Sequence, residues 1–572
     1  MASHDLIIRG GTVVDGTGVP SRHADVAVTN GIVTEVGTVD GPATREVDAD
    51  GALVAPGFVD IHTHYDGQAT WDDRMQPSSW HGVTTVVFGN CGVGFAPVHN
   101  TDHDKLVELM EGVEDIPGAA LHEGLQWDWK SFAEYLDACD APKDMDIATQ
   151  IPHGAVRLHV MGERGAAREN ATYEDIVEMG RLAAEGIVAG ALGFSTSRTA
   201  HHRTSTGDFT PTLTAASEEL VGIADAVGRT GTGVFQLVSD FVDREIEFQM
   251  LRDMCAISGR PLSFTIIENQ RSADFHTDLL DRIEQARADG LQITGQTPVR
   301  PIGILLGFEC TLNPFLHNPV WAEDANLVPA ERVTALADPD RRRRLLDASG
   351  GADMTAVGGR LIEKYDMMFE VGDSPNYEPD PGETLARRAE RMGITAPELA
   401  LDVLCGNGGT AMVWMPFSNF GHGNLNTTRD LLTHPYTVPS LSDGGAHVGT
   451  ICDGSFPTTL LQHWGRDRPE GRIDVEFLIQ RQCRDTARTV GLRDRGVLAP
   501  GYRADVNVID FDRLRVHQPE LAYDLPAGGR RLLQRADGYR HTIVAGIETY
   551  AEGEATGALP GRLIRGAQKA PT

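Results

Sequence analysis

The sequence predicts an α/β protein, a (β/α)8 barrel of the TIM type with a small β-sandwich domain formed by both ends of the chain. Two observations lead to this fold class. Short apolar segments alternate with helical patterns through the middle of the chain, and short strands separated by Gly and Asp turns recur near both ends. Strands alternating with helices favour a parallel sheet, whereas closely spaced strands and turns indicate an all-β unit.

Eight apolar segments are the candidate barrel strands. They lie at about 57–63, 84–90, 146–153, 190–196, 233–239, 262–268, 291–298 and 438–443. Helical patterns such as 173–185 and 216–228 separate them. In a barrel of this kind the chemistry takes place at the carboxyl ends of the strands, so the residues that end these segments are candidate site residues.

The domain limits follow from the same pattern. We expect residues 1–56 and 491–572 to form the β-sandwich and residues 57–490 to form the barrel. The interval at about 305–385 is too long for one barrel loop, which indicates an insertion placed as a lid over the mouth.

Composition limits the partners and the compartment. A formal net charge of -32 would repel nucleic acid and anionic membranes, so we expect a small-molecule substrate, with a homo-oligomer left open. The seven cysteines are widely scattered and imply no disulfide framework. The chain has no secretory leader pattern and no apolar run of membrane-spanning length, which predicts a cytoplasmic protein.

A His-x-His pair ends the first barrel segment. Side chains alternate along a strand, so His62 and His64 project to the same side, where two imidazoles can hold one metal ion. Cys91 ends the second apolar segment and offers a thiolate, although a buried inert thiol is the alternative. Asp443 ends the last segment, where a carboxylate can act as general base towards activated water; an ordinary Asp-Gly turn is the alternative.

The chain resembles the amidohydrolase superfamily and, within it, the N-acyl-D-amino-acid deacylase (D-aminoacylase) group. The residues that carry the resemblance are 5–16, 56–64, Gly-Asn-Cys-Gly at 89–92 within 82–92, 190–196, 442–445 and 500–505. The resemblance implies a catalytic metal, usually zinc, bound through His62, His64 and Cys91, with Asp443 as general base and ligand.

The chain also departs from that group. There is no lysine between 143 and 364, so a carbamylated lysine cannot bridge two metals. The group has histidines on strands five and six, but here Gln236 and Glu268 stand near those places. Both are candidate ligands, as is His447. One or two zinc ions, or another divalent metal, are therefore expected.

The candidate substrate-binding residues follow the fourth and eighth strands. They are Arg198, His201, His202 and His447, for which a structural salt bridge or ordinary loop histidines are the alternatives. The group grips a substrate carboxylate with basic residues where this chain has Asn269, Gln270 and the segment 448–453. A simple N-acyl-D-amino acid is therefore not expected, unless Arg198 or an arginine of the insertion replaces that grip.

The sequence thus predicts a metal-dependent amidohydrolase that cleaves a C–N bond in a linear or cyclic amide. In this reaction Asp443 takes a proton from activated water and returns it to the leaving nitrogen. Two alternatives are a decarboxylase or lyase on the same barrel, and a non-catalytic scaffold that has lost its metal.

Overall fold

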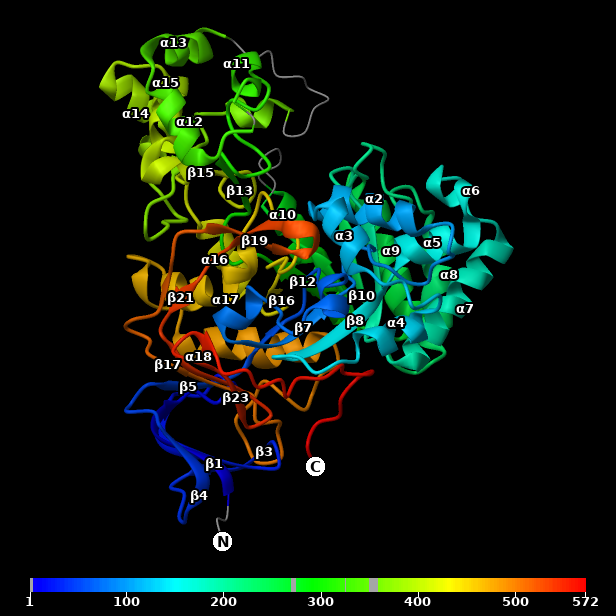
Figure 1. Ribbon diagram of the computed structural model, residues 1–572. Coiled ribbons are helices and arrows are strands. Elements are labelled where there is room, and N and C mark those ends of the chain that lie inside the picture. Colours follow the sequence, from blue (N-terminus) through cyan, green and yellow to red (C-terminus); the bar gives the residue numbers. More distant parts are fainter. Residues whose placement is uncertain (1–3, 269–273, 325, 349–358) are drawn as a thin grey trace.

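A computed structural model describes residues 4–268, 274–324, 326–348 and 359–572 (Figure 1). Its central sheet has eight parallel strands. The strands pair in chain order and are β6 (Phe58–Asp60), β7 (Val83–Phe88), β8 (Asp146–Pro152), β9 (Gly193–Arg198), β10 (Val234–Ser239), β11 (Leu262–Thr265), β12 (Ile293–Thr297) and β16 (Thr437–Pro439). Each overlaps one of the eight segments predicted from the sequence.

The first and last strands of this sheet meet just beyond their carboxyl ends. Thr63 and Gly444 form a parallel bridge, and the amide of His64 donates to the carbonyl of Gly444 at 2.8 Å. The amide of Asp443 donates to the carbonyl of His62 at 3.2 Å. This arrangement is consistent with a TIM-type barrel, and it brings the residues after β6 beside those after β16.

Helices follow the barrel strands. They are α1 (Gln68–Trp71), α2 (His103–Glu114), α3 (Gly118–Gly124), α4 (Phe132–Cys139), α5 (His153–Met161), α6 (Glu163–Ala166), α7 (Tyr173–Ala189), α8 (Ser217–Gly228), α9 (Arg244–Ser258), α10 (Phe275–Ala288), α16 (Asn426–Thr433), α17 (Phe456–Thr459), α18 (Val475–Gln480) and α19 (Thr486–Thr489). The longer ones, such as α7 and α8, bury one apolar face. Thr172 begins α7 with a capping box to Asp175, as its sequence favours. No described helix has the length and apolar character needed to cross a membrane.

Strands from both ends of the chain form one nine-stranded sheet, at the bottom of Figure 1. The strands are β1 (His4–Val13), β2 (Arg22–Thr29), β3 (Ile32–Gly37), β4 (Ala43–Asp48), β5 (Leu53–Pro56), β17 (Val506–Ile509), β22 (Tyr539–Val544), β23 (Ile547–Ala551) and β24 (Glu554–Ala555). β17 joins the two groups by pairing with β5 on one side and β22 on the other. The pairing shows one connected sheet, so a two-layered sandwich stays a prediction.

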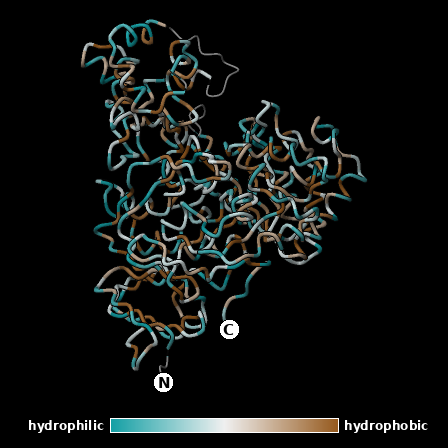
Figure 2. The backbone as a smooth tube through the Cα atoms, viewed as in Figure 1, coloured by the Kyte–Doolittle hydropathy of each residue, from teal (hydrophilic) through white to brown (hydrophobic). Residues whose placement is uncertain are grey.

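A third group of elements lies between β12 and β16 and occupies the top of Figure 1. Its elements are the three-stranded sheet of β13 (Gly303–Gly307), β14 (Phe369–Glu370) and β15 (Met412–Pro416), with α11 (Pro319–Ala322), α12 (Pro329–Leu336), α13 (Pro339–Asp347), α14 (Leu385–Met392) and α15 (Ala396–Leu404). These elements bury an apolar cluster of their own. Figure 2 shows hydrophobic residues along the chain in this region as well as in the barrel. The role of this region as a lid stays a prediction.

Two two-stranded sheets complete the described fold. One pairs β18 (Arg515–Val516) with β21 (Ala536–Asp537), and the other pairs β19 (Glu520–Leu525) with β20 (Gly529–Leu533). The second lies against the barrel mouth, where the amide of Leu532 donates to the carbonyl of Val448 at 2.6 Å.

A buried ion pair fastens the C-terminal segment to the barrel. The carboxylate of Asp146, at the start of β8, accepts hydrogen bonds from Arg495 and Arg503, each at 2.8 Å. Asp146→Ala would leave the fully buried Arg495 guanidinium without this partner. We expect the free energy of unfolding to fall by about 3–5 kcal/mol in denaturant titration. Replacing the exposed Asp137 by Ala should change it by no more than about 0.5 kcal/mol, and equal effects would contradict the assignment.

Candidate metal site

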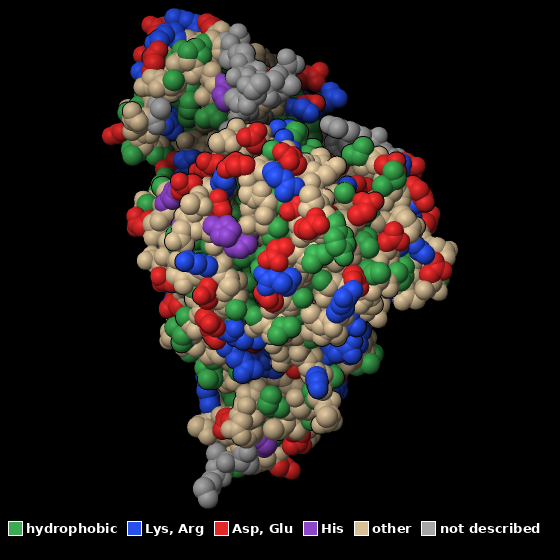
Figure 3. Space-filling view, turned by 90° about the vertical axis from the view of Figure 1, so that its right-hand side faces the viewer, with side chains coloured by type: hydrophobic (Ala, Val, Ile, Leu, Met, Phe, Trp, Pro, Cys, Tyr) green, Lys and Arg blue, Asp and Glu red, His purple; other side chains and the backbone are tan. Residues whose placement is uncertain are grey.

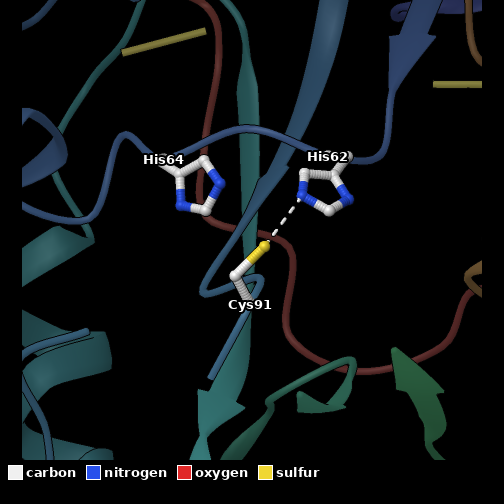
Figure 4. A group of neighbouring side chains, drawn as sticks. All are labelled: His62, His64 and Cys91. Atoms are coloured by element: carbon white, nitrogen blue, oxygen red, sulfur yellow. Dashed lines mark hydrogen bonds between the residues drawn. The ribbon is translucent and has the colours of Figure 1, made fainter. Parts of the chain in front are cut away.

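The two predicted histidines lie at the mouth of the barrel, directly after β6. Both side chains are buried, and their ring centroids are 5.5 Å apart. Figure 4 shows the two imidazoles and the Cys91 sulfur turned toward a common space. Nε2 of His62 lies 3.3 Å from the Cys91 sulfur. The strand geometry therefore places the His-x-His pair as the sequence predicts.

A tight turn after β7 positions Cys91. Gly89 has a φ of 74°, and a Cβ there would lie 2.2 Å from the carbonyl oxygen of Gln150, so the turn requires glycine. The side-chain amide of Asn90 donates to the carbonyls of Thr63 and Val87, which connects the turn to the segment after β6. The Gly-Asn-Cys sequence thus has a clear local purpose: it brings the thiol to the histidines.

Asp443 follows β16, the last strand of the barrel sheet, and its carboxylate lies beside both histidines. Its Oδ1 lies 3.5 Å from Nε2 of His62 and 3.7 Å from Nε2 of His64. Asp443 and Cys91 both have left-handed backbones, with φ values of 47° and 55°. Such conformations cost free energy in residues other than glycine and cluster at functional sites.

Three of these side chains, His62, His64 and Cys91, form a group that could hold one divalent ion, and Asp443 lies beside its two histidines. Bonds of about 2.0–2.3 Å in a tetrahedral zinc site would place the ligand atoms about 3.3–3.8 Å apart. The distances from the Cys91 sulfur to His62 and from Asp443 to both histidines fall in that range, and the His62, His64 and Cys91 donors lie within 4.8 Å of one another. Asp443 Oδ1 is buried without a hydrogen-bond partner among the described residues, so an ion there would satisfy it.

Two further side chains lie behind the histidines. Nδ1 of His62 forms a hydrogen bond with Oε1 of Gln296 at 2.8 Å, whereas Nδ1 of His64 lies 3.2 Å from Oε1 of Glu114, an ion-pair distance without hydrogen-bond geometry. In each ring the other nitrogen, Nε2, is the atom near Asp443. Metal-binding histidines usually have such a partner on their second nitrogen, which fixes the tautomer and the ring orientation.

Sequence reasoning missed Glu114, although a signal was present. Buried residues of α2 include Val107 and Met110, which recur at helical spacing, and Glu114 continues that face. A carboxylate on the buried face of an otherwise amphipathic helix is costly unless it has a partner. That position therefore marks a candidate functional residue.

The protonation of the site also suits a cation. Burial lowers the pKa of His62 to about 4 and that of His64 well below its usual value, so both imidazoles are neutral and can bind metal. Burial, followed by nearby carboxylates, raises the pKa values of Asp443, Glu114 and the Cys91 thiol well above normal. A bound divalent cation would counter both effects on these acids.

Three other predicted residues lie around this group. His447 has its Nε2 3.6 Å from Glu114 and 3.9 Å from Asp443. Nδ1 of His202 lies 2.9 Å from the Ser197 hydroxyl. Gln236 accepts the backbone N–H of Cys91 at 3.0 Å, so its carbonyl oxygen supports the turn that holds the thiol.

The remaining predicted residues have other contacts. Glu268 accepts from the amide of Gly421 at 3.0 Å and lies 3.5 Å from His422. Arg198 forms a two-pronged ion pair with Glu247, which corresponds to the structural alternative considered for it. His201 is exposed. Their functional roles, like that of Gln236, stay predictions.

Of the positions where this chain lacks the basic residues of the deacylase group, the structure describes the segment 448–453. Asn269 and Gln270 lie outside the described residues. The segment after Asp443 is described, and there the amide of Gly449 and the hydroxyl of Thr450 donate to Asp115.

Comparisons of the sequence with known proteins support the resemblance. A family model described as the amidohydrolase family matches residues 45–550. D-aminoacylase of Alcaligenes xylosoxydans xylosoxydans is 34% identical over 229 residues, which cover 40% of this chain and 43% of that protein. N-acyl-D-glutamate deacylase of the same organism is 25% identical over 98% of this chain and 96% of its own length.

Solved structures show the same fold. A D-aminoacylase structure described for its binuclear metal centre superposes with a TM-score of 0.65 at 23% identity, covering 98% of this chain and all of that one. N-acyl-D-glutamate deacylase of Bordetella bronchiseptica, in complex with zinc and a phosphonate inhibitor, gives a TM-score of 0.63 at 22% identity, with 98% and 99% coverage.

Proposed function

This chain belongs to the amidohydrolase family, and we propose that it hydrolyses the C–N bond of a linear or cyclic amide in the manner of the N-acyl-D-amino-acid deacylases. One observation carries the proposal: donors of His62, His64, Cys91 and Asp443 converge at the barrel mouth. A decarboxylase and a metal-free scaffold are not favoured, because the relatives with which the chain aligns are deacylases.

We propose zinc as the ion. Two imidazoles and a thiolate are donors that zinc prefers, whereas magnesium and calcium prefer oxygen ligands. The relative from Bordetella bronchiseptica is a zinc complex, which supports the choice. When bound, zinc would supply a polarised substrate carbonyl and water of lowered pKa.

The chain's own residues would then perform the proton transfers. Asp443 is placed to accept a proton from the attacking water and to return it to the leaving nitrogen. Glu114 and Gln296 would hold the rings of His64 and His62 in the tautomers that leave Nε2 free for the ion. His447, whose Nε2 lies 3.9 Å from Asp443, would orient the substrate.

A paired substrate panel tests the function. Zinc-loaded protein would be given N-acyl-D-amino acids, the matching N-acyl amines without the carboxylate, and cyclic amides, with amine and carboxylate release measured. We expect hydrolysis of at least one class, and the pairs report whether a carboxylate is needed. Carbon dioxide release without amine would favour a decarboxylase. No turnover of any member by protein carrying one metal per chain would contradict the proposal.

Glu114→Gln tests the carboxylate that lies behind His64. Loss of the carboxylate behind His64 is expected to weaken zinc affinity by about 10–100-fold, because the imidazole loses its orienting partner. Competition with a chelator measures the affinity, independently of activity. Glu108 is exposed on the same helix, so Glu108→Gln is the control and should bind zinc normally. Equal affinities for the two variants would exclude the role given to Glu114.

We also propose how the chain is divided into domains. The apolar cluster of the terminal sheet joins residues of both chain ends, such as Val26, Val54 and Val506, which supports one sandwich domain made of 1–56 and 491–572. The region between β12 and β16 would act as a lid on the barrel domain, 57–490. We also propose a cytoplasmic location and self-association.

A further inference from the structure

A second concave site lies at the opposite end of the barrel. Its cavity of about 720 Å³ is bounded by the starts of β10 and β11, the end of α19 and the C-terminal residues 567–570. The metal-site residues follow the carboxyl ends of their strands, whereas this cavity lies where strands begin. Its size falls within the range of small-molecule sites.

The lining of this cavity is positively charged, although the whole chain has a negative net charge. Five of its lining residues are basic, namely Arg260, Arg287, Arg488, Arg493 and Lys569, and none of the lining residues is acidic. The whole chain carries 82 acidic and 50 basic residues, and Figure 3 shows the two kinds interleaved over much of one face. Five cations around one cavity without a carboxylate is therefore an exceptional local composition.

These cations also lack acidic partners among the described residues. None of the five forms an ion pair with a described Asp or Glu, whereas Arg181 on α7 contacts both Glu178 and Glu185. Like charges gathered in a concave surface repel one another and focus a positive potential. A bound anion would relieve that repulsion.

Two of the arginines are held in place by the protein. Arg260 donates to the carbonyl of Gly231 at 2.6 Å, while its Nε is buried without a hydrogen-bond partner. Arg287 donates to the carbonyl of Ile293 at 2.7 Å and lies over the ring of Tyr436 at 5.1 Å. Burial lowers the pKa of Arg287, as expected for a cation that lacks an anionic neighbour. Fixed guanidinium groups suit phosphate or carboxylate oxygens.

We propose that this cavity binds a small polyanion, a molecule with several phosphate or carboxylate charges. The cavity volume of about 720 Å³ suits a small molecule, and the overall charge of -32 repels a nucleic acid. Because the lining joins strand starts, α19 and the C-terminal segment, the bound anion would tie these parts together and stabilise the fold. The site is separate from the metal centre, so the proposal does not depend on the reaction catalysed there.

Calorimetric titration with two probes tests the proposal. Pyrophosphate represents phosphate charge and citrate represents carboxylate charge, each compared with sodium chloride at equal ionic strength. We expect a Kd below about 1 mM for at least one probe and a rise in the unfolding temperature at saturation. Preference for one probe identifies the anion class.

Variants locate the binding. Arg260→Gln combined with Arg488→Gln is expected to weaken binding at least tenfold, while Arg181→Gln on the surface of α7 leaves it unchanged. If the double variant does not fold, Arg493→Gln with Lys569→Gln, at two exposed positions, replaces it. Binding no stronger than that of chloride, or equal binding by the cavity and control variants, would overturn the proposal.

Discussion

Replacement of both His62 and His64 by alanine is expected to abolish metal binding and to lower the rate of amide hydrolysis by at least about 10³-fold. The two imidazoles supply half of the four donors, and their Nε2 atoms lie within 3.7 Å of Asp443 Oδ1. Cys91 and Asp443 alone leave an incomplete coordination shell. Metal analysis of the purified variant and the rate of amine release measure the two effects separately.

A matched control removes two other histidines. His99 and His122 are both exposed, so their double replacement by alanine should leave the metal content and the rate unchanged. Circular dichroism would establish that each variant is folded. A His62/His64 variant that still binds one zinc ion with wild-type affinity would show that the site lies elsewhere, and the proposed chemistry would then fail with it.

The sequence was sufficient for the parts of the site that follow strand periodicity. His62 and His64 share a face because side chains alternate along β6 and its extension, and Cys91 follows β7 at the same end of the sheet. Asp443 follows the last strand, and the closure between Thr63 and Gly444 brings it to the histidines. Parallel strands align their carboxyl ends, so four residues distant in sequence could be placed together.

Tertiary packing decided the parts that the sequence could not predict. Glu114 ends a helix, and only the packing of α2 against the barrel mouth brings its carboxylate to His64. Arg198 ends a strand, as Cys91 and Asp443 follow strands, but Glu247 on α9 forms an ion pair with its guanidinium. Strand position gives the end of the barrel on which a residue lies, whereas a neighbouring helix determines its partner.

The same distinction applies to the terminal sheet. Alternating apolar residues predicted strands near both ends of the chain, and those strands form. Which strands pair depends on contacts between residues far apart in sequence, such as Val54 with Val508. Nothing in the local pattern specifies that β17 lies between β5 and β22, so the connected sheet became visible only in the structure.

Asp443→Asn is expected to lower kcat by about 10²–10⁴-fold, with a smaller change in KM, if Asp443 transfers the proton. The amide keeps an oxygen that can contact the metal but has no basic site for the proton of water. The variant should therefore retain most of its zinc while losing turnover. Parallel measurements of metal content and steady-state kinetics separate a lost base from a lost ligand.

Asp50→Asn is a suitable control because Asp50 is exposed and also has a left-handed backbone, with a φ of 47°. Asparagine tolerates this conformation, so neither substitution should strain the chain. The control should keep wild-type kcat, metal content and stability. If Asp443→Asn kept both its zinc and its wild-type kcat, another group would have to accept the proton, and His447 is the nearest candidate at 3.9 Å from Asp443.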